Sequence, residues 1–282
     1  MNDNNFKNPW EITPKQLANP WEVGNGRSVL DRQNNPASQK DNKIVNLQLQ
    51  SKNQVFIDKI FAGLQSLTNK KLALLDNGAI VFHNVNLKGI KISGMNVKGT
   101  TAGTVLIDKI LNSKHKVMIY ETSGNNYTKP NNAKLSKHFA PPEGSGTGES
   151  VSVFYNAQLK GDDILNEDNS TGRSPFIGLC HEMLHAKKIV YGEVNPAFYQ
   201  CKIPVFTENP SNFLISYLTM EEIETRTEEN VLRKELSEKS RKLPIVVRLA
   251  TYIEVKDFLK KQFEFQPELL ENAIPKQNKQ NK

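Results

Sequence analysis

The spacing of apolar residues divides the middle of the chain into helices and strands. Apolar residues three and four positions apart predict helices at 52–68, 101–112 and 175–191, and a charged segment is expected to form another at 218–236. Short apolar runs bounded by turn residues predict strands at 79–83, 88–93, 115–122 and 151–156. The polar stretches predict loops at 123–148, 157–174 and 192–217. The sequence therefore predicts an α+β fold.

Both ends of the chain are polar. Residues 1–50 and 266–282 are rich in Asn, Gln, Lys and Pro, and such segments bury too little apolar surface to offset the entropy of ordering. We therefore expect one folded domain over residues 51–265 between two disordered tails. In this domain a small mixed sheet should pack on the helices at 175–191 and 218–236, with the active site between the two helices.

Composition narrows the classes of partner. The formal net charge is +7, but the lysines are scattered and no basic stripe with interleaved aromatics is present, so no nucleic-acid partner is expected. No apolar run reaches the length of about 18 residues that a membrane span needs, and the start lacks the pattern of a cleaved signal peptide. Cys180 and Cys201 are too few for a disulfide framework and predict reduced thiols.

The N-terminal segment contains a short repeat. The sequence Asn-Pro-Trp-Glu at residues 8–11 recurs at residues 19–22, and the two copies hold both tryptophans of the chain. Two exposed tryptophans in matched contexts would indicate a peptide that docks on a partner or clips onto the domain. The alternative is that both simply pack on the domain surface.

The helix predicted at 175–191 carries the pattern His-Glu-x-x-His, at His181, Glu182 and His185. Histidines four residues apart project from one helix face, as a tetrahedral zinc ion requires of two nitrogen ligands. Glu182 is offset by about 100°, so it can act on an activated water without being a ligand. Zinc lowers the pKa of water to about 7, and a carboxylate can then take the proton. The alternative is a core helix with two satisfied histidines, which is costly without partners.

A catalytic zinc site needs a third protein ligand. No histidine follows His185, which excludes the metzincin spacing. A carboxylate, a cysteine or an upstream histidine remains open as the ligand. The helix at 218–236 offers the glutamates Glu221, Glu222, Glu224, Glu228 and Glu229. Most of these are expected to be solvated, but one of them could be the ligand.

The sequence around the motif resembles a known group of zinc peptidases. Residues 181–186 (HEMLHA), with Tyr191-Gly192 and Asn195-Pro196 after them, are similar to the zinc helix of clostridial neurotoxin light chains. Residues 220–225 (MEEIET) resemble the Phe-Glu-Glu-Leu-Arg-Thr segment of those toxins, in which the second glutamate is the third zinc ligand. This resemblance implies that Glu222 is the third ligand. Glu221 would then be a partner for a ligating histidine.

A closer resemblance is to the NleD-like effector metallopeptidases, which bacteria inject into host cells. It rests on residues 229–235 (ENVLRKE) and on VSVFYN at 151–156, and the whole resemblance covers roughly residues 140–245. It implies a zincin-like metallopeptidase domain with one Zn²⁺ per chain, held by His181, His185 and Glu222. Glu182 would be the general base.

One part of the family pattern differs in this chain. The related proteins have an Arg-x-x-Tyr pair that stabilises the oxyanion of the transition state. Arg241 occupies the position of that arginine, but Pro244 replaces the tyrosine. Arg248 and Tyr252 form an alternative pair, spaced one residue wider. Arg233 is expected to make a structural ion pair instead.

The leading hypothesis is a zinc endopeptidase exported by a type III-like route without a cleaved signal. It would act as a monomer in the host-cell cytosol and cut a host protein; the resemblance points to signalling kinases, which the known family member cuts. Two alternatives stay open. One is an inactive effector that binds a host protein through the Asn-Pro-Trp-Glu repeats, and the other is a metallopeptidase toxin domain that acts on competitor bacteria.

Overall fold

The computed structural model describes residues 46–83, 91–92, 101–131, 146–205 and 213–262. Its helices are α1 (Gln54–Leu67), α2 (Thr101–Leu111), α3 (Pro175–Tyr191), α4 (Met220–Glu235) and α5 (Tyr252–Gln262). Its strands are β1 (Leu47–Gln50), β2 (Leu72–Leu74), β3 (Ala79–Phe82), β4 (Lys91–Ile92), β5 (Val117–Glu121), β6 (Tyr127–Pro130), β7 (Val151–Tyr155), β8 (Phe198–Pro204), β9 (Phe213–Thr219) and β10 (Ile245–Leu249).

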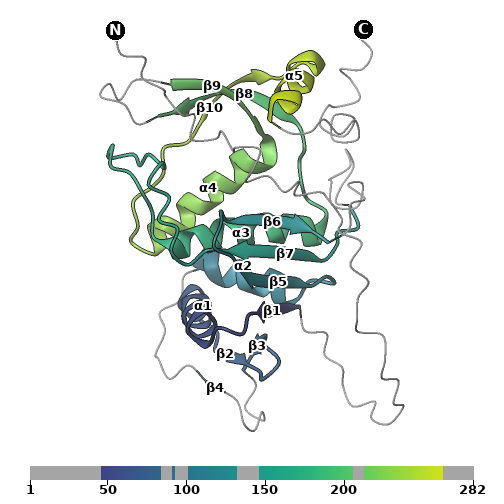
Figure 1. Ribbon diagram of the computed structural model, residues 1–282, viewed down its shortest axis with the longest axis vertical. Coiled ribbons are helices and arrows are strands. Elements are labelled where there is room, and N and C mark those ends of the chain that lie inside the picture. Colours follow the sequence, from purple (N-terminus) through teal and green to yellow (C-terminus); the bar gives the residue numbers. More distant parts are fainter. Residues whose placement is uncertain (1–45, 84–90, 93–100, 132–145, 206–212, 263–282) are drawn as a thin grey trace.

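Seven of the strands form a mixed sheet in the order β4-β2-β3-β1-β5-β7-β6. Its centre is parallel, with Leu47 of β1 opposite Val117 of β5, and Val117 opposite Val151 of β7. The other pairings are antiparallel, and β6 is the last strand at one end of the sheet. The sheet occupies the lower half of Figure 1, with β6 nearest to α4.

The helices α1, α2 and α3 cover one face of this sheet. Alternate residues of the central strands, such as Leu47, Val117 and Val151, are fully buried, while the residues between them are partly exposed. The buried set forms a single hydrophobic cluster with apolar residues of all three helices. A strand points successive side chains to opposite faces, so this alternation assigns one face to the core.

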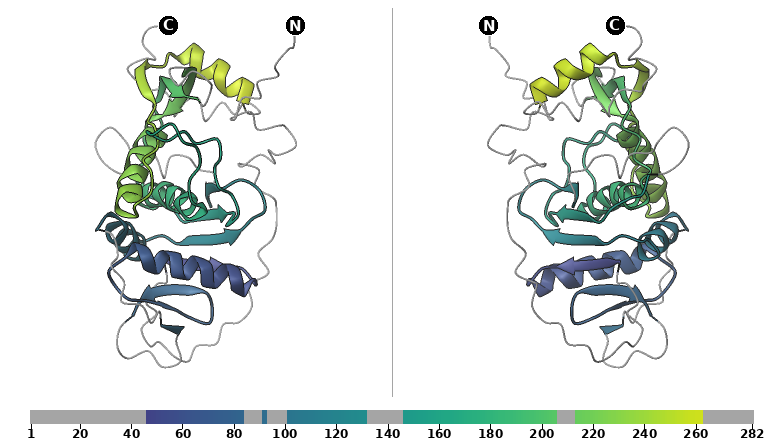
Figure 2. Two further views of the ribbon diagram at one scale, coloured as in Figure 1. Left: turned by 90° about the vertical axis from the view of Figure 1, so that its left-hand side faces the viewer. Right: turned by 90° about the vertical axis from the view of Figure 1, so that its right-hand side faces the viewer.

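A second sheet lies at the other end of α4. It is antiparallel, in the order β10-β8-β9, and β9 leads directly into α4. The helix α5 packs on it through Val255 and Leu259, which contact Phe198 and Tyr217 in a small second cluster. Figure 1 shows α4 crossing between the two sheets, and the side views of Figure 2 show it along one flank.

Local sequence fixes both ends of α3. Ser174 is the N-cap, accepting a hydrogen bond from the amide of Ile177, and Pro175 takes the first helical position. The helix ends at Gly192, in the left-handed conformation with φ 68°. A Cβ added there would lie 2.4 Å from the backbone of Gly146. Both the positive φ and this close approach require glycine at position 192.

The structure confirms a mixed α+β fold, and every predicted helix is present with small shifts of its ends. Three predictions were wrong. The folded part begins at β1, so residues 47–50 belong to the sheet and not to a disordered tail. The predicted loop 123–148 contains β6, and the predicted loop 192–217 contains β8 and most of β9. The strands β2 and β10 and the helix α5 were not predicted.

These errors have a common physical cause. The strand β1 alternates Leu and Gln, but four residues inside a polar segment give a weak signal. The strands β6 and β8 are mixed in polarity because they lie at sheet positions with partly exposed faces. The repeats at 8–11 and 19–22 lie outside the described residues. None of the helices in the described ranges combines the length and apolar character that crossing a bilayer requires.

Candidate metal centre

The helices α3 and α4 bring three polar side chains to one point. His181 and His185 lie one turn apart on α3, and Glu222 lies in the first turn of α4. The Nε2 atoms of the two histidines are 3.1 Å apart. Oε2 of Glu222 lies 3.2 Å from Nε2 of His185 and 3.6 Å from Nε2 of His181. Within the described ranges, this is the group of His, Cys, Asp and Glu side chains that could hold a metal ion.

The three separations match the edges of a tetrahedral zinc site. Metal–ligand bonds of about 2.0–2.1 Å in a tetrahedron place two ligand atoms about 3.3 Å apart. The distances of 3.1, 3.2 and 3.6 Å lie around that value. Two imidazoles and one carboxylate also leave a fourth position for water or substrate, as catalytic zinc sites do. The donor set therefore fits a metal such as zinc.

A different carboxylate of α4 lies against Nδ1 of each histidine, the ring nitrogen that is not part of the candidate metal site. Nδ1 of His185 lies 2.6 Å from Oε1 of Glu221, and Nδ1 of His181 lies 2.7 Å from Oε2 of Glu229. A carboxylate at Nδ1 accepts the ring proton there, so Nε2 presents a lone pair to a metal. Each imidazole is therefore fixed in orientation and in tautomer by α4.

The face of α4 turned toward α3 is charged. Its residues recur at spacings of four and three, at Glu222, Arg226, Glu229 and Arg233. Nε of Arg226 donates to Oε1 of Glu222 at 2.5 Å, and Nε of Arg233 donates to Oε1 of Glu229 at 2.6 Å. Both arginines are almost completely buried. Buried ion pairs of this kind are costly to break because the remaining charge loses its partner.

Glu229 is the meeting point of several cations. Besides His181 and Arg233, its Oε2 lies 3.4 Å from Nη1 of Arg173 and 3.7 Å from Nη1 of Arg241. Burial raises the pKa of this carboxyl, but the hydrogen bond from His181 and the nearby cations together bring it below its usual value. Glu229 is therefore ionised, and its charge is shared between a candidate metal ligand and three arginines.

The histidine and glutamate pKa values are shifted in opposite directions. Burial lowers the pKa of His185, but Glu221 and Glu222 raise it well above its usual value of 6.5. Burial likewise lowers the pKa of His181, which Glu222 and Glu229 raise to a net value above normal. Burial raises the pKa of Glu222, but Arg226 and His181 hold it well below its usual range. Without a metal, these side chains attract protons to the imidazoles and keep the carboxylates charged.

Glu182 follows His181 on α3 and contacts the end of the sheet. Its side chain is buried, and its Oε2 accepts a hydrogen bond from Oγ1 of Thr128 at 2.8 Å. The same hydroxyl lies 2.9 Å from the backbone oxygen of Glu182. Thr128 belongs to β6, so the strand at the end of the sheet touches the residue expected to be the general base.

A buried lysine joins α3 to the first turns of α4. Nζ of Lys188 donates to the backbone oxygen of Glu221 at 3.0 Å, to Oγ1 of Thr225 at 3.2 Å and to Oε2 of Glu224 at 3.1 Å. Oγ1 of Thr225 in turn donates to Oε1 of Glu221 at 3.0 Å. Lys188 and Thr225 therefore fix the part of α4 that carries Glu221 and Glu222.

The residues predicted to stabilise the oxyanion lie in two different places. Arg241 is buried, and its backbone amide and carbonyl are both bonded to the side chain of Asn230, at 2.7 and 2.8 Å. Burial and the nearby Arg226 lower the pKa of Arg241 to about 10, while Glu229 and Glu222 raise it. Arg248 instead forms an exposed ion pair with Glu254 in the second sheet and α5.

Tyr252 begins α5, beyond the second sheet. The contacts described for Arg248 are with Glu254 and with the backbone of Leu249, and none joins it to His181 or Glu222. The structure therefore brings Arg241 to the charged network around the centre and leaves Arg248 outside it. Whether Arg241 acts in catalysis stays a prediction.

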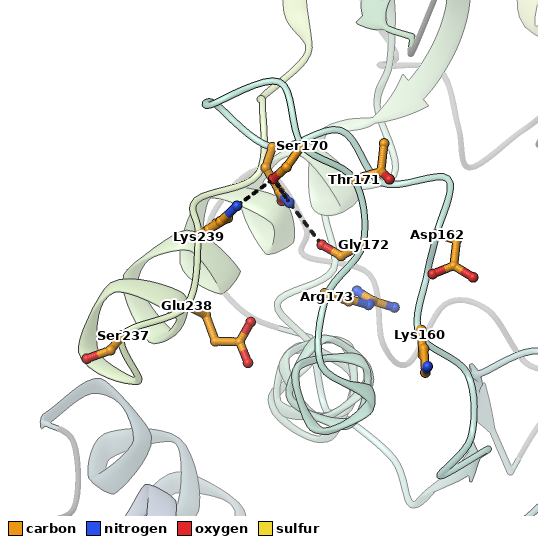
Figure 3. Close-up of a pocket in the computed structure, with 10 residues that line it drawn as sticks. Lys160, Asp162, Ser170, Thr171, Gly172, Arg173, Ser237, Glu238 and Lys239 are labelled. Carbon is orange, nitrogen blue, oxygen red and sulfur yellow. Dashed lines mark hydrogen bonds between the residues drawn. The ribbon is translucent and has the colours of Figure 1, made fainter.

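A polar cavity of 470 Å³ lies beside the start of α3. Figure 3 shows Arg173 among its lining residues, together with Lys160, Asp162 and Glu238. Ser170 and Lys239 are hydrogen-bonded on its wall, at 3.1 Å. Through Arg173 the cavity wall contacts Glu229, which in turn contacts His181. The cavity is therefore separated from the histidines by only two side chains.

Sequence reasoning missed three contributors to the centre. Glu229 was grouped with solvated glutamates, although Arg233, predicted to make an ion pair, does pair with it. Arg226 and Thr128 were not considered. Glu222 and Arg226 are four residues apart, and so are Glu229 and Arg233. This spacing was the available signal that the side chains pair along α4. No sequence signal linked Thr128 to Glu182, because the two lie 54 positions apart.

A comparison with protein families finds a match for the segment that contains α3. Residues 95–214 match the model of peptidase family M91, described as effector protein. This segment is similar in sequence to the M91 effector proteins. The NleD-like resemblance predicted from the sequence is thereby confirmed. The M91 match covers less than half of the chain and ends before α4, so Glu222, Glu229 and Arg241 lie outside it.

A search among curated proteins returned no match. The M91 assignment therefore rests on the family comparison, which includes His181, Glu182 and His185 together with Thr128. The family supports a peptidase-type effector. The sequence match to a peptidase family and the geometry of the three candidate ligands are compatible with a peptidase that binds a metal.

Proposed function

We propose that this protein is a zinc endopeptidase that is delivered into a host cell and hydrolyses a peptide bond of a host protein. The observation that carries the proposal is the convergence of His181, His185 and Glu222 beside Glu182. The separations of 3.1, 3.2 and 3.6 Å between the candidate ligand atoms are those expected of a tetrahedral site. The M91 effector match supports both the peptidase chemistry and the action on a host.

The residues have separate roles in this proposal. His181, His185 and Glu222 hold the metal, which when bound polarises the peptide carbonyl and makes water a stronger acid. Glu182 takes a proton from water as the oxygen adds to the carbonyl carbon. It then delivers that proton to the amide nitrogen as the C–N bond breaks. Arg241 is the cation we assign to the negative charge that develops on the carbonyl oxygen.

The position of β6 supports a polypeptide as substrate. The strand β6 is the last in its sheet and carries Thr128, which contacts Glu182. A strand that ends a sheet offers unpaired backbone groups to an extended peptide. A peptide paired along β6 would run next to the general base. The zincin-like arrangement implied by the family is compatible with this geometry.

Cleavage of host proteins by matched variants tests the proposal. Wild-type protein, Glu182→Gln and the control Glu167→Gln, whose glutamate is exposed, would each be incubated with a eukaryotic cell lysate. New protein N-termini would be labelled and identified by mass spectrometry, and zinc content measured for all three. We expect new termini with wild type and Glu167→Gln, and a loss of about 10²-fold or more with Glu182→Gln at unchanged zinc.

Two results would contradict the proposal. The first is a zinc-loaded wild-type protein that produces the same termini as Glu182→Gln. The second is a wild type that contains no zinc even after supplementation. In either case a protein-binding effector would become the better hypothesis, and co-purification of a host protein with Glu182→Gln would be the next measurement.

A further inference from the structure

We infer that Thr128 is a positioning residue that holds the general base Glu182 in its reactive orientation. The inference rests on the proposed function, because it assigns Glu182 its role in hydrolysis. It concerns a residue on β6, far in the sequence from both the histidine motif and α4.

The hydroxyl of Thr128 makes an unusual double contact with a single residue. Oγ1 lies 2.8 Å from Oε2 of Glu182 and 2.9 Å from the backbone oxygen of Glu182. The backbone oxygen is part of α3 and is therefore fixed. A hydroxyl that spans both atoms ties the carboxylate to its own backbone. It restricts rotation of the Glu182 side chain.

Only one oxygen of the carboxylate is occupied by this contact. Within the described part of the chain, the hydrogen bond to this carboxylate is made at Oε2, by Thr128. One oxygen therefore serves as the anchor and the other is available to take a proton from water. When Oε1 takes up the proton, Oε2 remains a hydrogen-bond acceptor. Thr128 can thus keep donating to Oε2 both before and after Glu182 takes up a proton.

The strand that carries Thr128 is itself held in place. Thr128 lies opposite Val153 of β7, and its neighbour Tyr127 lies opposite Phe154. On the outer face of the sheet the ring of Tyr127 stacks on Phe154, with centroids 4.5 Å apart, and Phe154 stacks on Tyr120 at 5.2 Å. Because successive side chains of a strand point to opposite faces, this outer stack leaves Thr128 directed toward α3.

Both ends of β6 are also anchored by asparagines. Oδ1 of Asn126 accepts a hydrogen bond from the amide of Asn156 at 2.7 Å, just beyond β7. Oδ1 of Asn131 accepts one from Oγ of Ser152 at 2.8 Å. The hydroxyl of Thr128 is therefore presented from a rigid frame rather than from a loop. A catalytic group held in this way avoids the entropy cost of finding its orientation during the reaction.

The test compares three variants in steady-state kinetics. Thr128→Val removes the hydroxyl and keeps the shape, and Thr128→Ser keeps the hydroxyl. Thr104→Val is the matched control. Thr104 lies on α2, and its hydroxyl accepts a hydrogen bond from the amide of Asn69, so this variant also removes a bonded hydroxyl. The probe is a proteome-derived peptide library, from which one peptide that wild type cleaves is resynthesised for measurement of kcat and KM. Zinc content and melting temperature are measured for each protein.

We expect Thr128→Val to lower kcat by about 10- to 100-fold, with little change in KM or zinc content. Thr128→Ser should restore most of kcat, and Thr104→Val should match wild type. A purely structural role would instead lower the melting temperature or zinc content without a selective loss of kcat.

The outcomes distinguish a failure of the role of Thr128 from a failure of the proposed function. Equal kcat for Thr128→Val and wild type would overturn the role of Thr128 and leave the proposed function intact. A kcat loss in Thr128→Val that Thr128→Ser does not restore would also overturn it. If zinc-loaded wild type cleaves no peptide of the library and no lysate protein, the proposed function fails, and the inference falls with it.

Discussion

Oε2 of Glu229 lies 2.7 Å from Nδ1 of His181, and the glutamate is fully buried between α3 and α4. The other oxygen of the same carboxylate accepts a hydrogen bond from Arg233 at 2.6 Å. One carboxylate therefore orients a candidate metal ligand and neutralises a buried cation. Metal binding and the packing of α4 are coupled through this single side chain.

Replacement of Glu229 by Gln should weaken both functions. We expect zinc affinity to fall by about 10- to 100-fold, because His181 loses the acceptor that fixes its tautomer. We also expect the free energy of unfolding to fall by about 3–5 kcal/mol, since Arg233 and its neighbours would lose their counterion. Competition with a zinc-binding dye measures the affinity, and denaturant titration measures the stability.

The matched control for this prediction is Glu228→Gln. Glu228 is the preceding residue on α4, partly exposed and paired with Lys187. The Glu228→Gln substitution should leave zinc affinity unchanged. Equal zinc affinity in Glu229→Gln and Glu228→Gln would show that the contact with His181 does not matter for metal binding.

The third ligand can be identified by comparing Glu222→Gln with Glu221→Gln. Glu222 faces both Nε2 atoms, whereas Glu221 contacts Nδ1 of His185. We therefore expect Glu221→Gln to weaken zinc binding by about 10- to 100-fold and Glu222→Gln to weaken it much more. Elemental mass spectrometry of the purified proteins measures this order. The reverse order would make Glu221 the ligand.

The sequence indicated the candidate ligands on α3 more directly than the one on α4. His181, Glu182 and His185 form a motif because the periodicity of one helix places them together, and this periodicity can be read from neighbouring residues. The partners on α4 depend on how two helices pack, which no local pattern specifies. The family resemblance alone singles out Glu222, and Glu229 is one of the glutamates of which most are expected to be solvated.

The fold, too, was predicted well in some elements and missed in others. The helices α1, α2 and α3 were predicted because each carries apolar residues at helical spacing that the core buries. The strand β6 was missed because its sequence, YTKP, has one side chain in an outer aromatic stack and the next bonded to Glu182. Neither position shows the apolar alternation of a core strand. A strand whose side chains contact a functional site can therefore lack the apolar pattern from which strands are predicted.

Arg241 and Arg248 were alternative predictions for the arginine that stabilises the oxyanion, and the structure separates them. Arg241 is buried beside Glu229, whereas Arg248 is exposed and paired with Glu254. With the pKa of Arg241 lowered only to about 10, its guanidinium stays charged at neutral pH. We expect Arg241→Gln to reduce kcat by about 10²- to 10³-fold and Arg248→Gln to leave it unchanged.

Zinc content separates two explanations of an Arg241 effect. If Arg241 acts on the reacting carbonyl, Arg241→Gln should keep its zinc and lose kcat. If it acts only by balancing the charge of Glu229, zinc affinity should fall together with activity. A normal kcat in Arg241→Gln, or a large loss in Arg248→Gln, would contradict the assignment.

The dependence of stability on pH should reverse when zinc is removed. In the metal-free protein the pKa values of His181 and His185 are above 6.5, despite burial, because of Glu221, Glu222 and Glu229. A raised folded-state pKa stabilises below the unfolded value, and this contribution is lost as the pH rises through the folded value. Glu222 has a lowered pKa, so its contribution is lost only in acid, below its usual value of 4.5.

Zinc changes the sign because it binds neutral imidazoles and competes with protons. From about pH 6 to about pH 8, the melting temperature of the chelator-treated protein should therefore fall, and that of the zinc-loaded protein should rise or stay level. Differential scanning calorimetry of both forms across this range measures the two slopes. The double variant His181→Gln, His185→Gln should remove the fall in the metal-free series, since the two imidazoles whose pKa values are raised are then absent. Parallel slopes with and without zinc would mean that the two histidines neither hold protons in the free protein nor exchange them for a metal.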